Sequence, residues 1–295
     1  MRTTRWQRWS GLLFIAPWLI TFIWFTLGPF IASIILSLTN YRFIGLPTWV
    51  GLDNYVRLFT DDPKFIRSVI NTLYYTAVHV PGIMIMAFFV AILLNQKVKG
   101  QPIYRTAFYL PSVTAGVATA YLWILLLQPN GLVNQFLGLV GIDGPNWLTS
   151  STWAMPALIL MSFWGLGTTM IIYLAALQGI PQHLYEAASV DGAGVVRKMW
   201  HVTVPMMTPA IFLTAVLQII GSWQVFTQAL IVTNGGPRDS TLFILLHLYR
   251  TGFEYFQMGY ASAIAWVLFV IILVFTILQF GIARRWVYYE GATER

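Results

Sequence analysis

Residue types that could carry out covalent or metal chemistry are sparse in this sequence. It has four histidines and no cysteine. The histidines lack the His-x-x-x-His or His-Glu spacing typical of zinc sites, so we expect no metal site. No Gly-x-x-x-x-Gly-Lys-Ser/Thr segment occurs, so we do not expect this chain to bind ATP through a phosphate-binding loop. The sequence therefore predicts no catalytic residue and no cofactor in this chain.

One group of side chains could instead bind a polar, uncharged solute such as a sugar. Within the helix predicted near 207–232, Gln224, Thr227 and Gln228 fall on one face at i, i+3 and i+4 spacing, with Trp223 adjacent. Long amides are costly to bury against lipid unless they are paired or face a wet cavity. The group could therefore line a solute pathway. The alternative is that both glutamines bridge neighbouring helices.

The composition shows which elements must position these residues. Of the 295 residues, 58% are hydrophobic and only 9% are charged, whereas soluble domains have about 25% charged residues. The net charge of +7 lies in short clusters between long apolar runs, a pattern typical of membrane topology rather than nucleic-acid binding. Six runs are long enough to cross the roughly 30 Å hydrocarbon core as helices. They lie near 11–36, 70–95, 104–127, 153–178, 207–232 and 261–283.

The distribution of basic residues predicts the orientation. Eleven Lys and Arg residues lie at the N-terminus, in loops 96–105 and 179–205, and at the C-terminus, while the alternate loops have six. The more positive side of a membrane protein is cytoplasmic, so we expect both termini inside. The first apolar run is longer than the core of a signal peptide, which favours a retained span. We therefore expect residues 1–295 to form one all-α transmembrane domain.

The span interiors contain no Asp, Glu, Lys or Arg. An ion-coupled transporter usually needs an intramembrane carboxylate or histidine relay. His79 lies within a span, and we expect it to make a hydrogen bond between helices. The driving energy must then come from outside the membrane.

Loop 179–205 has the most informative local sequence. Pro181 and the Glu186-Ala187-Ala188 stretch favour a helix. Asp191-Gly192 should end it, because glycine readily adopts the left-handed conformation, and Pro205 and Pro209 should open the next span. We expect two short helices joined at a glycine elbow. A plain amphipathic connector is the alternative.

This loop resembles the EAA loop of permeases from binding-protein-dependent ABC importers. The family pattern is Glu-Ala-Ala, three residues, Gly, nine residues, Ile, one residue, Leu-Pro. Glu186, Ala187, Ala188 and Gly192 match it, and Val202 and Val204 replace the Ile and Leu before Pro205.

Other segments resemble the maltose-type sugar permeases of that family and follow the same order over residues 11 to about 284. They are Gly51–Tyr55, Asn71–Thr76, Arg105–Pro111, Tyr173–Pro181, Thr233–Thr241 and Gly259–Ala263. Many relatives have Asp where Thr227 stands, so the family's solute contacts do not transfer safely to this chain.

The resemblance implies a permease subunit of an ABC importer in the bacterial inner membrane. Its partners would be a second homologous permease, two cytoplasmic ATPase subunits that hold ATP and Mg²⁺, and an external solute-binding protein. Glu186, Ala187, Ala188, Asp191 and Gly192 would contact the ATPase.

Outside, segments 40–66 and 234–258 would dock the solute-binding protein, with a polar, charge-balanced composition that suits a reversible contact. Their candidate residues are Asp53, Asn54, Asp61 and Asp62. The alternative is an ordinary loop that closes the helix bundle.

The solute would be a sugar or sugar-like molecule, with a polyol or glycerol phosphate as alternatives. Two other functional classes remain open. A stand-alone secondary transporter or channel would work without an ATPase. A membrane enzyme such as a lipid transferase should show a His, Asp or Glu cluster at the membrane surface, which this sequence lacks.

Overall fold

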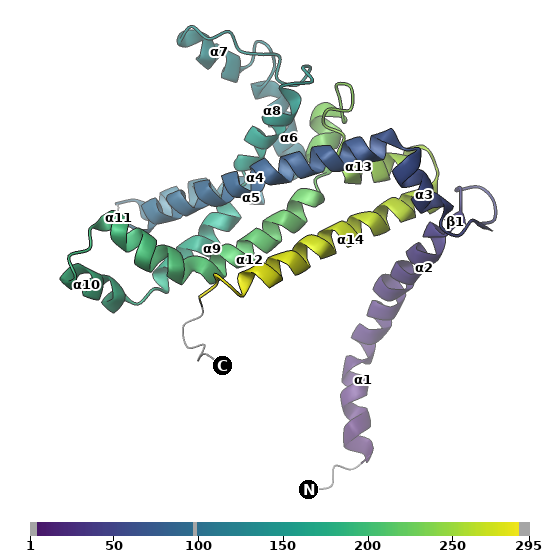
Figure 1. The fold of residues 1–295 in the computed structure, drawn as a ribbon, viewed down its shortest axis with the longest axis horizontal. Helices are drawn as coiled ribbons and strands as arrows, with labels where there is room; N and C mark the ends of the chain where they lie inside the picture. Colours follow the sequence, from purple (N-terminus) through teal and green to yellow (C-terminus); the bar gives the residue numbers. More distant parts are fainter. Residues whose placement is uncertain (1–4, 97–98, 289–295) are drawn as a thin grey trace. The chain divides into compact units, whose positions relative to one another are not determined.

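The computed structural model describes residues 5–96 and 99–288, with side chains from Phe14 onward. Several basic residues used for the orientation, including Lys97 and Arg295, lie outside the described residues. The chain forms two compact units. Figure 1 labels the helices and the first strand. Unit 1 takes residues from 1–63 and 248–267, and unit 2 takes residues from 64–247 and 268–295.

Unit 1 contains the first apolar helices and a small hairpin. Its elements are α1 (Arg5–Phe22), the π-helical η1 (Ile23–Leu27), α2 (Gly28–Ser37), β1 (Thr39–Asn40), β2 (Thr48–Trp49), α3 (Asp53–Thr60) and the π-helical η4 (Arg250–Glu254). β1 and β2 pair antiparallel, with Thr39 opposite Trp49. Gly259 packs against this hairpin, since a β-carbon there would lie 2.0 Å from the carbonyl oxygen of Thr39. Only glycine allows this close backbone approach.

Unit 2 is a helical bundle. Its elements are α5 (Gln101–Val113), α6 (Gly116–Leu126), α7 (Leu132–Leu139), α8 (Ala154–Phe163), α9 (Gly167–Gln178), α10 (Gln182–Val190), α11 (Val195–Lys198), the π-helical η2 (Met199–Thr203), α12 (Val204–Trp223) and the π-helical η3 (Ala229–Thr233). Helices α4 (Pro63–Asn95), α13 (Ile244–Tyr249) and α14 (Met258–Ala283) have residues in both units.

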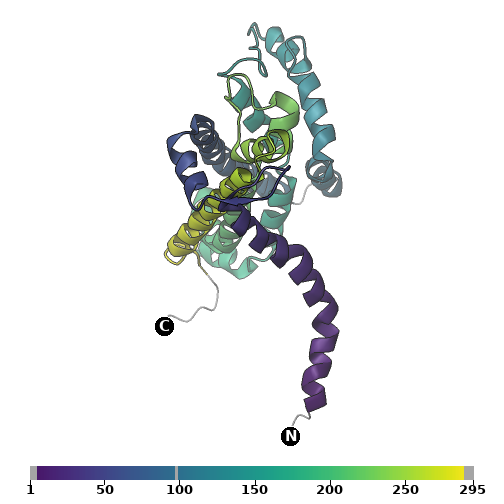
Figure 2. The same cartoon turned by 90° about the vertical axis from the view of Figure 1, so that its right-hand side faces the viewer.

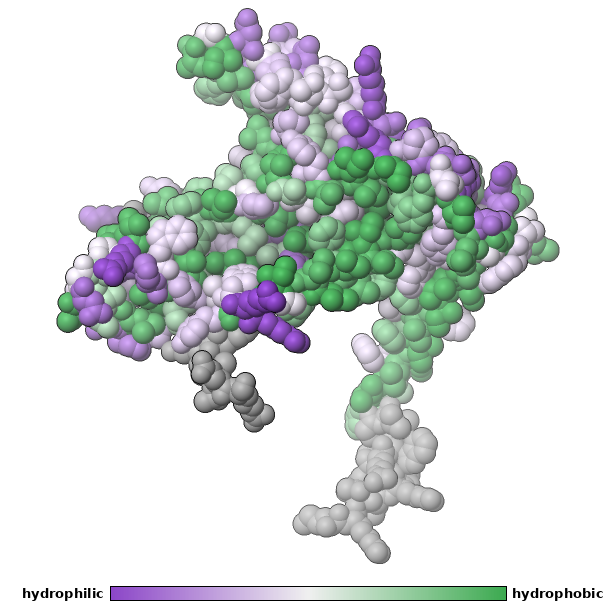
Figure 3. Space-filling model, in the orientation of Figure 1, coloured by the Kyte–Doolittle hydropathy of each residue, from purple (hydrophilic) through white to green (hydrophobic). Residues whose placement is uncertain are grey.

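Apolar helices of membrane-spanning length confirm the prediction of about six spans. Among the described residues, four single helices are long and apolar enough to cross a membrane: Phe14–Ser37, Pro63–Asn95, Val195–Trp223 and Met258–Ala283. Two bent pairs, α5–α6 and α8–α9, bring the number to six if each pair is one span. Figure 3 shows hydrophobic residues over α12 and α14 and hydrophilic residues near α10 and α11.

The predicted third and fourth spans are each broken. Between α5 and α6 the chain turns by 100°. Figure 2 shows the same ribbon turned by 90° from Figure 1. Pro111 removes a backbone donor in the last turn of α5. At Thr114 and Ala115 the backbone leaves the helical region, with ψ of 141° and 127°. α8 and α9 are bent by 43° across residues 164–166.

The prediction for the fifth span was wrong at both ends. The helix begins at Val195, because α11 continues through η2 into α12, so Pro205 and Pro209 lie inside it. It ends at Trp223 instead of residue 232. Gln224 leaves the helical region with φ of −107° and ψ of 19°, and its N–H bonds to the carbonyl of Gly221 three residues back. That tight closure ends the α-helical ladder.

The core of unit 2 lies where α4 meets α9 and α12. Ala87 and Ala91 of α4 and Met170 of α9 are fully buried, as is Met207 of α12. Small residues let helix backbones approach closely in membranes, where packing rather than hydrophobicity drives association. This core positions the loop between α9 and α12 and the break between α8 and α9.

Candidate functional site

The residues that match the EAA pattern form a helical hairpin at the end of α9. α10 ends at Val190, Asp191 caps it, and Gly192 adopts φ of +75° before α11 begins at Val195. The predicted elbow at Gly192 is therefore confirmed. The expected separate second helix was wrong, because α11 is the first turn of the fifth span.

The elbow presents its candidate contact residues outward. Glu186, Ala187, Asp191 and Gly192 are exposed, and Ala188 is half-buried. Tyr185 Oη lies 3.0 Å from Thr203 Oγ1, which ties α10 to η2. The hairpin is thus held at its base while its tip is free to contact another protein.

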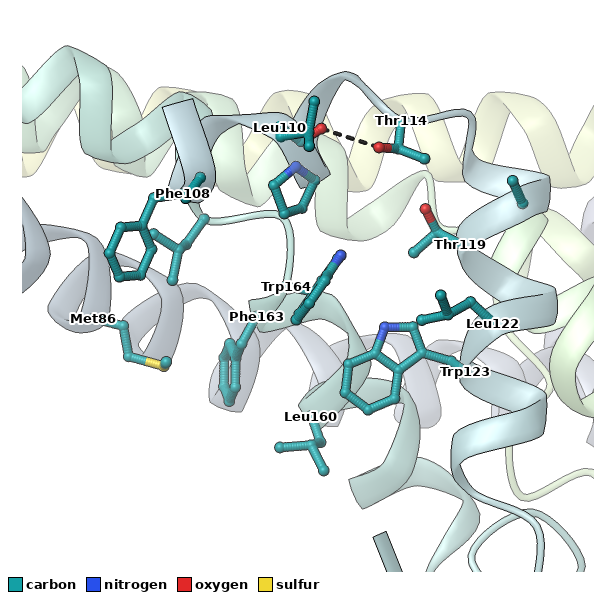
Figure 4. Close-up of a pocket in the computed structure, with 14 residues that line it drawn as sticks. Met86, Phe108, Leu110, Thr114, Thr119, Leu122, Trp123, Leu160, Phe163 and Trp164 are labelled. Atoms are coloured by element: carbon teal, nitrogen blue, oxygen red, sulfur yellow. Dashed lines mark hydrogen bonds between the residues drawn. The ribbon is translucent and has the colours of Figure 1, made fainter. Parts of the chain in front are cut away.

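The second feature is a cavity of about 620 Å³ beside the two broken spans (Figure 4). All 14 residues that line it are uncharged. They come from α4, from α5 and α6 on both sides of the 100° turn, and from the end of α8 and the break that follows it. The cavity therefore exists because these two spans are not straight.

Aromatic rings and hydroxyls give the cavity its chemistry. Trp123 and Trp164 meet edge to face, with ring centroids 6.0 Å apart. Trp123 is 8% exposed, whereas Trp164 is 48% exposed. Thr114 and Thr119 also line the cavity, and Thr119 projects from α6 one turn before Trp123 (Figure 4). An accessible flat ring beside hydroxyls suits a molecule with one apolar face and several hydroxyl groups.

The structure separates the residues that were predicted to share one helix face. Trp223 is 1% exposed and packs against Phe275 with ring centroids 5.5 Å apart. Gln224 is exposed at the end of α12, while Thr227 and Gln228 begin the next helical turn. The predicted common face was therefore wrong, because the chain leaves the helix at Gln224.

Thr227 nevertheless lies close to the cavity. A β-carbon on Gly116, the first residue of α6, would lie 3.8 Å from Cγ2 of Thr227. Thr227 thus packs beside the turn between α5 and α6 that forms one wall. Sequence reasoning missed Trp164 as a cavity residue; Gly165 and Gly167 beside it were the available signal of a break.

The four candidate docking residues lie in or beside α3 of unit 1. Asp53 and Asp61 are exposed. Asn54 is buried, and its Nδ2 donates to the carbonyl oxygens of Ser37 at 2.8 Å and Thr39 at 2.9 Å.

Asp62, half-buried, accepts a hydrogen bond from Tyr260 Oη at 2.8 Å. Two of the four side chains thus hold unit 1 together, and Asp53 and Asp61 are the outward-facing pair.

The intramembrane histidine makes the expected interhelical hydrogen bonds. His79 Nδ1 lies 2.7 Å from Ser162 Oγ on α8, and Nε2 lies 3.3 Å from Gln218 Oε1 on α12. This confirms the prediction that His79 joins helices.

Comparison with known proteins agrees with this architecture. The family model described as "Binding-protein-dependent transport system inner membrane component" matches residues 60–288. The chain is 43% identical to the probable ABC transporter permease protein YesP of Bacillus subtilis, covering 99% of this chain and 96% of that protein. It is 36% identical to the lactose transport system permease protein LacF of Rhizobium radiobacter, covering 93% and 94%.

A solved structure has the same fold. The bacterial alginate ABC transporter, in complex with alginate pentasaccharide-bound periplasmic protein, has a chain that aligns with a TM-score of 0.83 and 27% identity. The alignment covers 94% of each chain.

The fold and the family match define a transmembrane subunit of an importer. The chain belongs to the family of binding-protein-dependent transport system inner membrane components, and it is an ABC importer permease. This confirms the family that the sequence motifs indicated.

Proposed function

We propose that this permease carries a neutral sugar or oligosaccharide across the bacterial inner membrane. The observation that carries the proposal is the cavity, whose 14 lining residues are all uncharged and include two tryptophans. Relatives named for lactose and for arabinooligosaccharide transport support the same solute class.

The exposed face of Trp164 is the proposed platform for a sugar ring. A pyranose has an apolar face of C–H groups that packs on an aromatic ring, while its hydroxyls need hydrogen-bond partners. Thr114 and Thr119 offer such partners in the cavity, and Gln224, Thr227 and Gln228 are proposed to extend the path beyond α6. Trp223 is buried next to Gln224 in the sequence and is proposed to hold the start of this segment in place.

Energy for transport is proposed to come from partner subunits. This chain would have no enzymatic activity of its own, and two cytoplasmic ATPase subunits would bind ATP and Mg²⁺. The exposed elbow of Glu186, Ala187, Ala188, Asp191 and Gly192 suits their contact surface. Glu186 would pair with a basic ATPase residue, and the two alanines would permit close approach.

A second homologous permease is proposed to complete the pathway. In the first span, Phe14–Ser37, none of the most apolar stretch is buried inside the chain. Its apolar side chains are therefore left for lipid and for helices of another subunit.

An external solute-binding protein is the proposed source of the sugar. Asp53 and Asp61, both exposed on unit 1, would belong to its docking surface with segments 40–66 and 234–258. Both chain termini would lie in the cytoplasm, as the distribution of basic residues indicates.

Glycerol phosphate is the alternative solute, because a permease named for sn-glycerol-3-phosphate transport is 33% identical to this chain. A phosphate group usually requires Arg or Lys at its binding site. The uncharged lining of the cavity favours the sugar.

The test is ATPase activity of the complete complex in liposomes, measured across a panel of neutral sugars and glycerol phosphate. We expect a neutral sugar to stimulate it, and Trp164→Ala to weaken the apparent affinity about tenfold, as loss of an aromatic contact of about 1 kcal/mol or more implies. Trp153→Ala is the control, since Trp153 is 42% exposed and packs on Trp147 outside the cavity.

Stimulation by glycerol phosphate alone would replace the sugar proposal. Equal effects of the two tryptophan variants would remove Trp164 from the solute path. Solute transport by the purified chain without any ATPase would establish a stand-alone transporter instead.

A further inference from the structure

Helix α12 presents three polar side chains along one face. Thr214, Gln218 and Ser222 follow one another at intervals of four residues, which places them one above the other on the helix. Each hydrogen-bonds to a side chain of another helix. Polar side chains within a membrane span are costly unless they are paired, so such a series needs a physical reason.

The first two side chains join α12 to α9. Tyr173 Oη lies 2.8 Å from Thr214 Oγ1, and Gln218 Nε2 donates to Thr169 Oγ1 at 2.8 Å. α9 and α12 pack side by side (Figure 1). The EAA hairpin connects these same two helices, so the two hydrogen bonds join the helices that carry it.

The series continues through α4. Thr76 Oγ1 lies 2.9 Å from Ser222 Oγ, and His79 lies between Gln218 and Ser162 at 3.3 and 2.7 Å. An amide oxygen only accepts, so His79 Nε2–H donates to Gln218 Oε1, while Nδ1 faces the Ser162 hydroxyl. One imidazole thus joins α12 to α8.

This chain of hydrogen bonds spans the break between α8 and α9. Ser162 is the second-last residue of α8, and Thr169 lies in the first turn of α9. His79 and Gln218 connect the two from outside the bent pair. Between them lie residues 164–166, and Trp164 and Leu166 line the cavity.

We infer that Gln218 and Thr169 are positioning residues that couple the EAA hairpin to the solute cavity. The inference rests on the proposed function. When α9 and α12 move with the hairpin, the bonds from Gln218 to Thr169 and through His79 to Ser162 hold both sides of the break in register. Trp164 then moves with the helices that carry the hairpin rather than independently.

Removing the Gln218 amide should loosen this link without unfolding the bundle. Interhelical hydrogen bonds in membranes contribute modestly, so losing two of them should change a conformational equilibrium by about three- to tenfold. Gln218→Met keeps the length of the side chain, and Thr169→Val keeps its shape. We expect solute-independent ATPase activity to rise about three- to tenfold in Gln218→Met, which loses two bonds, and about threefold in Thr169→Val, which loses one. Sugar uptake per ATP hydrolysed should fall in both.

Thr276→Val is the matched control. Thr276 is half-buried in α14, and its hydroxyl donates to the carbonyl oxygen of Ile272 in the same helix. Loss of this hydroxyl should leave the coupling ratio, which is sugar uptake per ATP hydrolysed, unchanged. In the double variant Thr169→Val with Gln218→Met, the rise in solute-independent ATPase activity should be smaller than the two single effects combined, because the two residues share one hydrogen bond.

The outcomes separate this inference from the proposed function. A wild-type complex that no sugar stimulates would overturn the proposed function. If a sugar stimulates the wild-type complex but the variants keep an uptake per ATP hydrolysed within twofold of the wild-type value, only the inference would be overturned. A lower yield of the variant complexes with an unchanged uptake per ATP hydrolysed would also overturn the inference, since a purely structural role predicts that result.

A distance measurement tests the same link directly. Leu160 on α8 and Ile171 on α9 are exposed on either side of the break, and the chain has no cysteine to interfere with labelling. Spin labels at these two positions should give one narrow distance distribution in the otherwise wild-type complex and a broader one with Gln218→Met. Equal widths would overturn the inference.

Discussion

Gly192 takes a backbone conformation that other residues adopt only with strain. Its φ is +75°, and a β-carbon added there would meet open space, so the cost of a side chain is conformational and not steric. Gly192→Ala should destabilise the elbow by about 1 kcal/mol. We expect fewer ATPase subunits to co-purify with the chain and slower sugar uptake.

Gly194 provides the matched control. It also has open space around it, but its φ of −72° and ψ of 174° suit any residue. Gly194→Ala should therefore leave ATPase co-purification and uptake unchanged. Equal losses from both substitutions would show that the left-handed turn is not what the ATPase contact needs.

Asn54 and Asp53 are neighbours with different roles. The Asn54 amide donates to two carbonyl oxygens, whereas Asp53 is exposed in the first turn of α3. Asn54→Asp keeps the shape but removes both donors and sets a carboxylate against two carbonyls. Thermal unfolding in detergent should show a loss of about 1–3 kcal/mol.

Asp53→Asn is the complementary exchange. It removes one exposed carboxylate from a helix N-terminus and should cost less than about 1 kcal/mol. If Asp53 contacts the solute-binding protein, the same variant should weaken stimulation by the loaded binding protein. Equal thermal shifts for Asn54→Asp and Asp53→Asn would contradict the structural role of Asn54.

At the scale of elements, the break before α9 allows two helices to touch. A β-carbon on Gly167 would lie 2.5 Å from the carbonyl oxygen of Phe108 in α5, which is backbone and cannot move aside cheaply. Gly167→Ala should therefore destabilise the packing of α5 against α9 by about 1–3 kcal/mol, measured by thermal unfolding of the purified complex.

Gly165 lies in the same break and tests the argument. Its β-carbon would be 3.5 Å from the nearest atom, an ordinary contact. Gly165→Ala should shift the unfolding temperature little. Suppose that Gly165→Ala destabilised the complex as much as Gly167→Ala. The need for glycine in this break would then come from backbone flexibility and not from the close approach to α5.

The accuracy of the sequence predictions differs between elements for a physical reason. Each apolar run was recognisable, because lipid requires about twenty apolar residues regardless of helix shape. The elbow was also predictable, since Gly192 and the Glu186-Ala-Ala stretch are local signals. The turn at Thr114 and Ala115 was not, because hydropathy stays high through it and only the backbone changes direction.

The cavity depended on those unpredicted breaks. Trp123 and Trp164 are 41 residues apart in the sequence, and only the turns in both spans bring their rings together. The same effect explains the error at Gln224 and Gln228. Their spacing implied one face only if the helix continued, and it ends at Trp223.

At the scale of the whole molecule, the distribution of charge predicts the orientation in the membrane. Eleven basic residues lie on the side predicted to be cytoplasmic and six on the other. The chain has no native cysteine, so single cysteines report their own positions. Asp61→Cys beside α3 and Ser189→Cys on α10 both replace exposed residues and suit labelling in intact cells.

We expect an impermeant thiol reagent added from outside to modify Asp61→Cys and not Ser189→Cys. After the membrane is permeabilised, both should react, which shows that Ser189→Cys is accessible and only shielded by the membrane. The reverse pattern would place the EAA hairpin outside, where no cytoplasmic ATPase could reach it. Labelling of both positions in intact cells would mean that the chain inserts in two orientations, contrary to a single topology set by its basic residues.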